Sequence, residues 1–255
     1  MHTSNSPFSL AGKTILVTGA SAGIGKAIAI ACAKMGATLL LNGRSEGRLQ
    51  ETLGSLPPGE HCMFAVDLSD SEGVQKMVDK LPPMDGVVHC AGIGHRKVCK
   101  FLDESDIDNV LNTNFKATVL LQTKLQQKRK LKKGASVVFI ASRAAESPSV
   151  GNAIYSASKG ALLAYARCLM LELAPQKIRV NSICPAMVWT ELITQEGPGR
   201  EALEEAQLRY PLKRFGQPED VAYLAVYMLS DAASWMTGSA VDITGGENNI
   251  TTLLS

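Results

Sequence analysis

Short apolar runs alternate with longer amphipathic segments along the whole of this 255-residue chain. The expected strands are short and largely aliphatic, as buried parallel strands are, and they lie at 14–17, 38–41, 61–66, 86–89, 136–140, 179–183 and 240–243. Hydrophobic residues recur at helical spacing between them, at 24–35, 71–80, 106–128, 155–173 and 219–229. This alternation predicts an α/β fold, a doubly wound parallel sheet with helices on both faces.

The connections are mostly short, and neither a repeat nor a linker divides the chain, so we expect a single domain spanning 1–255. The exception is the long stretch 189–215, which has a helical piece near 200–209 and several glycine and proline breakers. Because this stretch follows a strand, we expect it to form a lid over the carboxyl edge of the sheet, where open α/β sheets bind ligands.

Composition and charge exclude several classes of function. The chain is 45% hydrophobic and 20% charged with a formal net charge of +2, which gives no argument for nucleic acid as a partner. The first 13 residues are polar and no apolar run reaches membrane-spanning length, so we expect no signal peptide, no membrane contact and a cytoplasmic location. Six scattered cysteines form no C-x-x-C pair, so we expect no metal site and mostly buried, reduced thiols.

A glycine-rich turn, Thr18-Gly19-Ala20-Ser21-Ala22-Gly23-Ile24-Gly25, lies between the first expected strand and the first expected helix. Its glycines would let the backbone approach a pyrophosphate, and the helix start offers unpaired N–H groups and the positive end of the helix dipole. The same letters are also compatible with a plain strand–helix turn.

A second group of residues points to proton transfer. Tyr155 and Lys159 have an i, i+4 spacing, which places both side chains on one helix face. A neighbouring ammonium favours the phenolate, so we expect the pKa of Tyr155 to be lowered and the residue to exchange protons near neutral pH. Ser142 follows the strand 136–140 at the carboxyl edge, where its hydroxyl would reach a substrate carbonyl. Taken singly, these residues would also fit a solvated helix face and a turn.

These motifs, in this order, resemble the short-chain dehydrogenase/reductase family over roughly Gly12 to Gly246. The residues that carry the resemblance are Thr18-Gly19-x-x-x-Gly23-Ile24-Gly25, Asp67-Leu68, Cys90-Ala91-Gly92, Asn112-Thr113-Asn114, Ser142, Tyr155-x-x-x-Lys159, Ile178-Arg179-Val180-Asn181, Pro185 through Thr190, Arg214 through Asp220, and Gly245-Gly246. The resemblance implies a Rossmann fold, a nicotinamide cofactor and hydride transfer between the nicotinamide and a ketone or secondary alcohol.

The resemblance also implies roles for individual residues. Tyr155 would donate its proton to the developing alkoxide, and Lys159 would bind the nicotinamide ribose and lower the pKa of that tyrosine. Ser142 would polarise the carbonyl, and Asn114 would hold a water that links Lys159 to solvent. The residues implied to bind the cofactor are Gly19, Ser21, Gly23, Ile24, Arg44, Ser45, Asp67, Leu68, Ala91, Gly92, Tyr155, Lys159, Pro185, Val188 and Thr190.

The end of the second expected strand bears on which nicotinamide cofactor is used. The strand runs into Asn42-Gly43-Arg44-Ser45, with no acid to bind a ribose 2′-hydroxyl. A guanidinium at Arg44 and a hydroxyl at Ser45 would suit a 2′-phosphate, so we expect NADP(H) in preference to NAD(H). Arg44 as a solvated turn residue is the alternative.

Two positions depart from the family's pattern. Cys90 stands where the family usually has asparagine, and a thiol is a weak hydrogen-bond donor, so we expect some loss of local rigidity. Ala186 follows Pro185 where the family usually has glycine, and it would be strained if that position required a positive φ.

The expected substrate is a small carbonyl compound, first a 3-oxoacyl thioester, because 3-oxoacyl-acyl-carrier-protein reductases look nearest in length and motif order. A small ketone, sugar or ring alcohol is the alternative, and a non-catalytic cofactor sensor is disfavoured because the catalytic set is complete. Two sets of basic residues would suit an acidic acyl carrier protein, or else a solvated face. They are His95, Arg96, Lys97 and Lys100, and Lys124, Lys128, Arg129, Lys130, Lys132 and Lys133. They lack the interleaved aromatic residues of a nucleic-acid site.

The resemblance further implies a homotetramer in which the helices 106–128 and 155–173 pack across an interface. The second helix carries an apolar stripe that would suit such an interface or a plain core. The stripe consists of Leu162, Ala166, Leu169, Met170 and Leu173.

Overall fold

The computed structural model describes residues 6–196 and 199–247, and its centre is one seven-stranded sheet in which every pairing is parallel. The strand order is β3-β2-β1-β4-β5-β6-β7. The strands are β1 (Thr14–Thr18), β2 (Thr38–Gly43), β3 (Cys62–Ala65), β4 (Met84–His89), β5 (Leu131–Ile140), β6 (Arg179–Pro185) and β7 (Ala240–Ile243). All seven expected strands are present, and the predicted doubly wound parallel sheet is confirmed.

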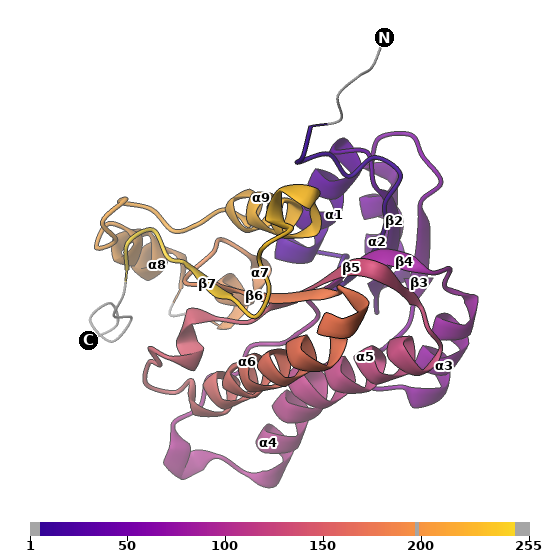
Figure 1. Ribbon diagram of the computed structural model, residues 1–255. Helices are drawn as coiled ribbons and strands as arrows, with labels where there is room; N and C mark the ends of the chain where they lie inside the picture. The colour runs from indigo at the N-terminus through magenta and orange to yellow at the C-terminus, as the bar shows by residue number, and fades with distance from the viewer. Residues whose placement is uncertain (1–5, 197–198, 248–255) are drawn as a thin grey trace.

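Helices cover both faces of the sheet (Figure 1). Figure 1 shows α4, α5 and α6 along one face and α1 and α9 along the other. The helices of the described residues are α1 (Gly23–Lys34), α2 (Glu46–Gly54), α3 (Ser71–Lys80), α4 (Glu104–Leu111), α5 (Ala117–Gln127), α6 (Ala153–Leu173), α7 (Glu191–Glu196), α8 (Arg200–Gln207) and α9 (Pro218–Leu229).

The order of the strands reverses beside β1, which pairs with β2 on one side and β4 on the other. In open α/β sheets a ligand binds in the crevice outside the carboxyl ends of the strands at such a switch point. The topology therefore places the glycine-rich turn after β1 at the expected ligand crevice.

The helical segment expected at 106–128 is present and runs without a gap from Glu104 to Gln127. It consists of α4, a π-helical turn at Asn112–Lys116, and α5. The sequence did not predict the π turn. Single π turns inside helices occur frequently at functional sites, and this one contains the predicted site residue Asn114.

The apolar stripe of α6 forms core rather than a surface. Leu162, Ala166, Leu169 and Leu173 are at most 5% exposed and pack with Phe139 of β5. The fifth member of the stripe, Met170, is half-buried and packs against this cluster. The alternative considered for the stripe, a plain core, is therefore what the structure shows for four of its five residues.

The cysteines differ from expectation as well. Cys32 and Cys184 are buried and Cys90 is half-buried, whereas Cys62, Cys99 and Cys168 are exposed. The prediction that most thiols are buried therefore fails at three positions. Within the described residues, no helix combines the length and the apolar character that crossing a membrane would require.

The predicted lid, 189–215, contains two helices, α7 and α8, and α8 corresponds to the helical piece expected near 200–209. Residues 197 and 198 of this stretch, and residues 1–5 and 248–255 of the predicted domain, lie outside the described residues.

Candidate active site

The turn after β1 has the backbone of a phosphate-binding turn. Gly19 and Gly23 have φ angles of +66° and +50°, a region that L-residues with side chains rarely adopt. A Cβ added at Gly25 would lie 2.2 Å from the Gly19 carbonyl oxygen, and one added at Gly19 would lie 3.0 Å from the Ala91 nitrogen. The turn is therefore folded tightly on itself and lies against the loop that follows β4.

The start of α1 suits an anion. Its N-cap residue, Ala22, makes no side-chain hydrogen bond, and its first turn contains no acid. By contrast, α2, α3 and α4 begin with the capping side chains of Ser45, Asp70 and Asp103. Without a cap, the first N–H groups of α1 have no side-chain acceptor, and together with the helix dipole they suit the pyrophosphate of a dinucleotide. Ile24, in the same turn, is half-buried and packs against the core.

Thr18 joins the ends of β1 and β4. Its hydroxyl accepts hydrogen bonds from the backbone N–H groups of Cys90 (3.0 Å) and Ala91 (3.1 Å) and lies 3.4 Å from the Val88 carbonyl oxygen, to which it donates. We expected Cys90 to weaken this region, but the threonine hydroxyl supplies a connection there. Sequence reasoning did not single out Thr18 for this role, although it lies inside the glycine-rich motif.

The side chains expected to bind the adenosine end gather at the carboxyl ends of β1, β2 and β3. A Cβ added at Gly43, the last residue of β2, would lie 3.2 Å from Ser21 Oγ. Arg44 and Ser45 follow on the surface, and Ser45 Oγ accepts a hydrogen bond from Arg48 N–H at the start of α2. The end of β2 therefore lies against Ser21 of the glycine-rich turn, and β2 does not end in an acidic residue.

Asp67 lies beside Arg44. Its carboxylate accepts hydrogen bonds from the Ser69 backbone N–H (2.8 Å) and hydroxyl (2.7 Å). These bonds, and to a smaller extent the charge of Arg44, hold the pKa of Asp67 below its usual value. Leu68, the next residue, is half-buried and packs against the core. The predicted adenosine-side residues Arg44 and Asp67 are thus close enough to interact electrostatically.

Lys159 is buried in α6 and lies close to Tyr155. Its ammonium donates a hydrogen bond to the Ile140 carbonyl oxygen (2.9 Å) and lies 5.8 Å from the centre of the Tyr155 ring. Ile140 is the last residue of β5 and lies two residues before Ser142 in the chain. The bond therefore fixes α6 to the carboxyl edge of the sheet, close to Ser142. Ser142 begins a 3₁₀ turn, and its hydroxyl oxygen accepts a hydrogen bond from Ala144 N–H (3.1 Å).

Asn114 connects three segments of this site. Its buried side-chain amide donates to the Ile93 carbonyl oxygen (2.9 Å) and to Ser158 Oγ (3.1 Å), and its Oδ1 accepts from Ile93 N–H (2.8 Å). Ser158 Oγ in turn donates to the Tyr155 carbonyl oxygen (2.7 Å). The side chain expected to hold a water is therefore bonded to the loop after β4 and to α6. Sequence reasoning missed Ser158, although it lies between Tyr155 and Lys159.

The burial of Lys159 changes its acidity. Burial lowers the pKa of its ammonium to about 8, and the thiols of Cys90 and Cys184 oppose this shift. A Cβ added at Gly92 would lie 3.2 Å from Asn114 Oδ1 and 3.4 Å from Lys159 Nζ, so the predicted cofactor residue Gly92 lies directly beside both side chains. The ammonium remains predominantly charged at pH 7, which the predicted support of a Tyr155 phenolate requires.

The segment after β6 crosses toward the phosphate turn. Ala186 donates its N–H to the Ile243 carbonyl oxygen (3.1 Å), and it is not among the described non-glycine residues with positive φ, so the strain considered for it is absent. Pro185 and Val188 are buried, and Val188 forms a parallel bridge with Gly216. A Cβ added at Gly23 would lie 3.2 Å from Thr190 Cγ2. Thr190, expected to hold the nicotinamide, therefore lies beside Gly23, which is expected to bind the pyrophosphate.

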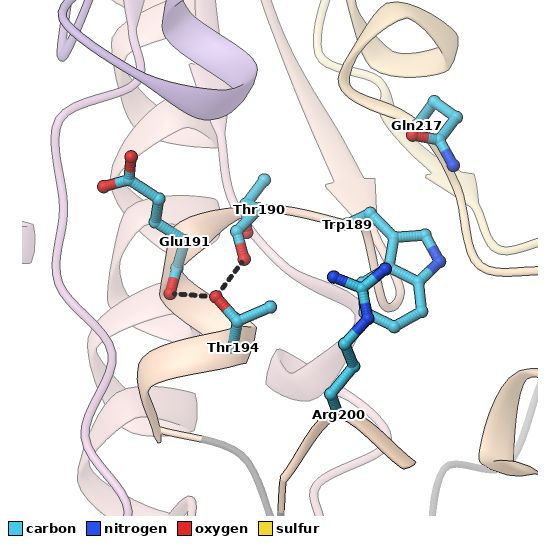
Figure 2. A pocket seen from close by; sticks show the side chains of 6 residues that line it. All are labelled: Trp189, Thr190, Glu191, Thr194, Arg200 and Gln217. Carbon is cyan, nitrogen blue, oxygen red and sulfur yellow. Dashed lines mark hydrogen bonds between the residues drawn. The ribbon is translucent and has the colours of Figure 1, made fainter. Parts of the chain in front are cut away.

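A cavity of about 490 Å³ opens beside this segment (Figure 2). It is lined by Trp189, Thr190, Glu191, Thr194, Arg200 and Gln217. Figure 2 shows the Arg200 side chain extending toward the Trp189 indole, whose Nε1 donates to Gln207 Oε1 (3.1 Å). The lining combines one aromatic surface with hydroxyls and side chains of both signs of charge.

Three of the lysines considered for docking form ion pairs. Lys97 binds Asp103 (3.0 Å) and Asp106. Lys128 forms an ion pair at 2.9 Å with Asp79 of α3, and Lys132 forms one at 2.8 Å with Asp85 of β4. From Asn114, α5 runs away from the carboxyl edge for about 20 Å, at 1.5 Å per residue. The basic residues after α5 therefore lie at the opposite edge of the sheet, whereas Arg96 and Lys100 are exposed in the loop after β4.

These features define a dinucleotide-dependent oxidoreductase. They are a glycine-rich turn at the switch point, an uncapped helix start behind it, and a buried lysine beside a tyrosine at the carboxyl edge. The comparisons with known proteins agree. The profile of a family described as enoyl-(acyl carrier protein) reductase matches residues 19–248. The chain belongs to the short-chain dehydrogenase/reductase family, whose members act on alcohol and ketone groups with NAD(P).

Two curated relatives illustrate the range of this family. The chain is 32% identical over 238 residues to a 3-oxoacyl-[acyl-carrier-protein] reductase of Rickettsia conorii, covering 93% of this chain and 97% of the relative. It is 33% identical over 243 residues to an L-xylulose reductase of Caenorhabditis elegans, covering 93% of this chain and 96% of the relative.

Solved structures show the same fold. A dehydrogenase/reductase from Sinorhizobium meliloti has a TM-score of 0.88 at 30% identity, covering 96% of this chain and 99% of that one. A protein assigned as an NAD(P)-dependent gluconate 5-dehydrogenase from Beutenbergia cavernae, with NADP bound at low occupancy, has a TM-score of 0.84 at 32% identity, covering 94% and 98%.

Proposed function

We propose that this protein is an NADP(H)-dependent carbonyl reductase whose first-choice substrate is a 3-oxoacyl thioester. The observation that supports it best is the junction of Lys159, Tyr155 and Asn114 at the carboxyl edge, next to the phosphate-binding turn. The chain acts as a single domain in this proposal, with 189–215 as the lid over the substrate.

When bound, the cofactor supplies the hydride at C4 of its nicotinamide. The Tyr155 hydroxyl donates its proton to the carbonyl oxygen, which leaves a phenolate. The Lys159 ammonium, fixed by the Ile140 carbonyl oxygen, stabilises that negative charge from its position beside the ring. A serine hydroxyl both accepts and donates, so Ser142 Oγ, oriented by Ala144 N–H, donates to the same carbonyl oxygen. The Asn114–Ser158 connection holds the backbone at Tyr155 in place.

Arg44 decides the cofactor preference in this proposal. We expect Arg44→Gln to weaken NADPH binding by about 10- to 100-fold, because a hydrogen bond to a charged group contributes about 1.5–3 kcal/mol. NADH, which lacks the 2′-phosphate, is expected to bind as it does to the native chain. Titration of both cofactors by fluorescence measures this, with Arg129→Gln, at an exposed residue beyond α5, as the control. Tighter binding of NADH than of NADPH by the native chain would contradict the assignment.

The substrate class is tested by a panel of carbonyl compounds with NADPH as reductant. We expect turnover of an acetoacetyl thioester. The relative named L-xylulose reductase and the neighbour assigned as a gluconate 5-dehydrogenase favour a sugar or small ketone as the second candidate. Activity on free sugars or cyclic ketones with none on thioesters would establish that candidate, whereas cofactor binding without any turnover would indicate a cofactor sensor.

We further propose a homotetramer built on the outer faces of α5 and α6 and located in the cytoplasm. Leu120 of α5 and Leu171 of α6 are 42% and 68% exposed, which suits an interface better than solvent. The three exposed free thiols suit a reducing compartment. Light scattering that gives the mass of one subunit would overturn the assembly.

A further inference from the structure

An ion pair links two elements on opposite sides of the cofactor crevice. Arg48 lies in the first turn of α2, and its Nη1 is 2.9 Å from Oε2 of Glu191, the first residue of α7. α2 follows β2, and α7 follows β6. Three strands, β1, β4 and β5, lie between β2 and β6 in the sheet, a separation of about 19 Å at 4.8 Å per strand. The chain that leaves β6 must therefore cross the switch point for these two side chains to meet.

A second contact shows where this crossing segment lies. Thr190, next to Glu191, has its methyl carbon 3.2 Å from the position of a Cβ at Gly23 in the phosphate turn. Figure 2 shows the Glu191 side chain directed away from Trp189 and Arg200, at the other end of the cavity. The crossing segment thus touches the phosphate turn through Thr190 and reaches α2 through Glu191.

We propose that the Arg48–Glu191 ion pair is a clasp that retains the bound dinucleotide, with both side chains acting as positioning residues. This inference rests on the proposed NADP(H) function, because it assigns the crevice between the two elements to that cofactor. Arg48 differs in role from Arg44, which lies beside Asp67, because its guanidinium binds a carboxylate on the opposite side of the crevice. Opening the crevice at this point requires the pair to separate, so the pair slows release of NADPH and of NADH alike.

The exposure of the pair sets the size of the effect. The side chains of Arg48 and Glu191 are 52% and 57% exposed. Ion pairs at such positions are weak and screened by salt, so their loss is expected to speed release by about two- to fivefold, within the range that exposed pairs contribute.

The test measures the rate of cofactor release by stopped-flow displacement, following the fluorescence of bound NADPH and, separately, of NADH. The variants are Glu191→Gln, Arg48→Gln and the charge-exchanged double variant Arg48→Glu/Glu191→Arg. The matched control is Glu72→Gln, which removes the carboxylate of the exposed Lys76–Glu72 pair on α3. We expect both single variants to release both cofactors about two- to fivefold faster, the double variant to recover slow release, and Glu72→Gln to behave as the native chain. Raising the salt concentration should speed release from the native chain more than from Glu191→Gln.

Two results would overturn the clasp while leaving the proposed function intact. One is release from Glu191→Gln at the native rate. The other is slower release of NADPH alone from Glu191→Gln, which would make Arg48 a ligand of the 2′-phosphate for which Glu191 competes. A native chain that binds neither NADPH nor NADH would contradict the proposed function, and the clasp with it.

Discussion

Replacing Tyr155 with phenylalanine is expected to lower kcat by about 10²- to 10⁴-fold, the usual contribution of a general acid, while NADPH still binds. The substitution removes one hydroxyl and keeps the ring. Two contacts that do not involve this hydroxyl remain in the variant: Ser158 Oγ donates to the backbone carbonyl oxygen of residue 155, and the Lys159 ammonium donates to the Ile140 carbonyl oxygen. The loss of rate should therefore report the missing proton donor and not a displaced helix.

The measurement is the steady-state rate of NADPH oxidation with the best substrate of the panel, alongside a fluorescence titration of NADPH. Tyr223→Phe is the matched control, because it removes the hydroxyl of a tyrosine that is 66% exposed on α9. We expect this control to show native rates. Near-normal turnover by Tyr155→Phe would remove Tyr155 from the role of general acid.

The parts of this molecule that the sequence predicts are those set by local pattern. The seven strands are short aliphatic runs between helical segments, and alternation alone leads to a parallel sheet. The i, i+4 spacing of Tyr155 and Lys159 likewise places both on one helix face without tertiary information. Even so, the first five residues of β5, 131–135, were missed, because the run contains Lys132, Lys133 and Gly134 and looks polar.

The parts that it does not predict depend on contacts between distant segments. The π turn at Asn112–Lys116 leaves no mark in the hydrophobic period, yet it places Asn114 where its amide reaches both Ile93 and Ser158. A serine such as Ser158 carries no local sign that its hydroxyl joins that amide to a backbone carbonyl. An apolar stripe is equally consistent with an interface and a core, and only the packing of Phe139 against α6 decides between them.

The ion pairs of the basic residues also depend on contacts between distant segments, which the sequence does not show. A run of lysines looks like a docking surface when its partners are far away in sequence. Asp79 and Asp85, which pair with Lys128 and Lys132, are 49 and 47 residues distant along the chain. The fold brings α3 beside the end of α5 and β4 beside β5, so Lys128 and Lys132 are paired with acids that lie far away in the sequence.

Replacing Lys159 with methionine is expected to abolish turnover and at the same time to stabilise the cofactor-free protein. Burial lowers the pKa of this ammonium from its ordinary value of 10.5 to about 8, so the folded state holds the charged form at a cost. A pKa shift of this size corresponds to a free-energy cost of about 3 kcal/mol for holding the charge in the folded state. Loss of the hydrogen bond to the Ile140 carbonyl oxygen would destabilise the variant by about 1 kcal/mol. The net expectation at pH 7 is a gain of about 2 kcal/mol in the free energy of unfolding.

The pH dependence separates this effect from a general change in packing. Between pH 8 and 10.5 the unfolded chain binds a proton at Lys159 that the folded chain has released, so this lysine makes native stability rise with pH. Its cost is fully present below pH 8 and disappears toward pH 10.5. The advantage of Lys159→Met over the native chain should therefore be largest near pH 7 and shrink as the pH approaches 10. Urea unfolding of both proteins at several pH values measures it, with Lys34→Met, at an exposed lysine of α1, as the control.

A difference in stability that does not change with pH would mean that methionine simply packs better, and a destabilised variant would mean that the Ile140 hydrogen bond outweighs the cost of the buried charge. If the expected result is obtained, a residue that destabilises the fold is also the one that supplies the cation beside Tyr155. Such a trade between stability and activity is expected at a site that must hold a charge away from water, because the same burial that lowers the pKa of Lys159 strengthens its attraction for the phenolate.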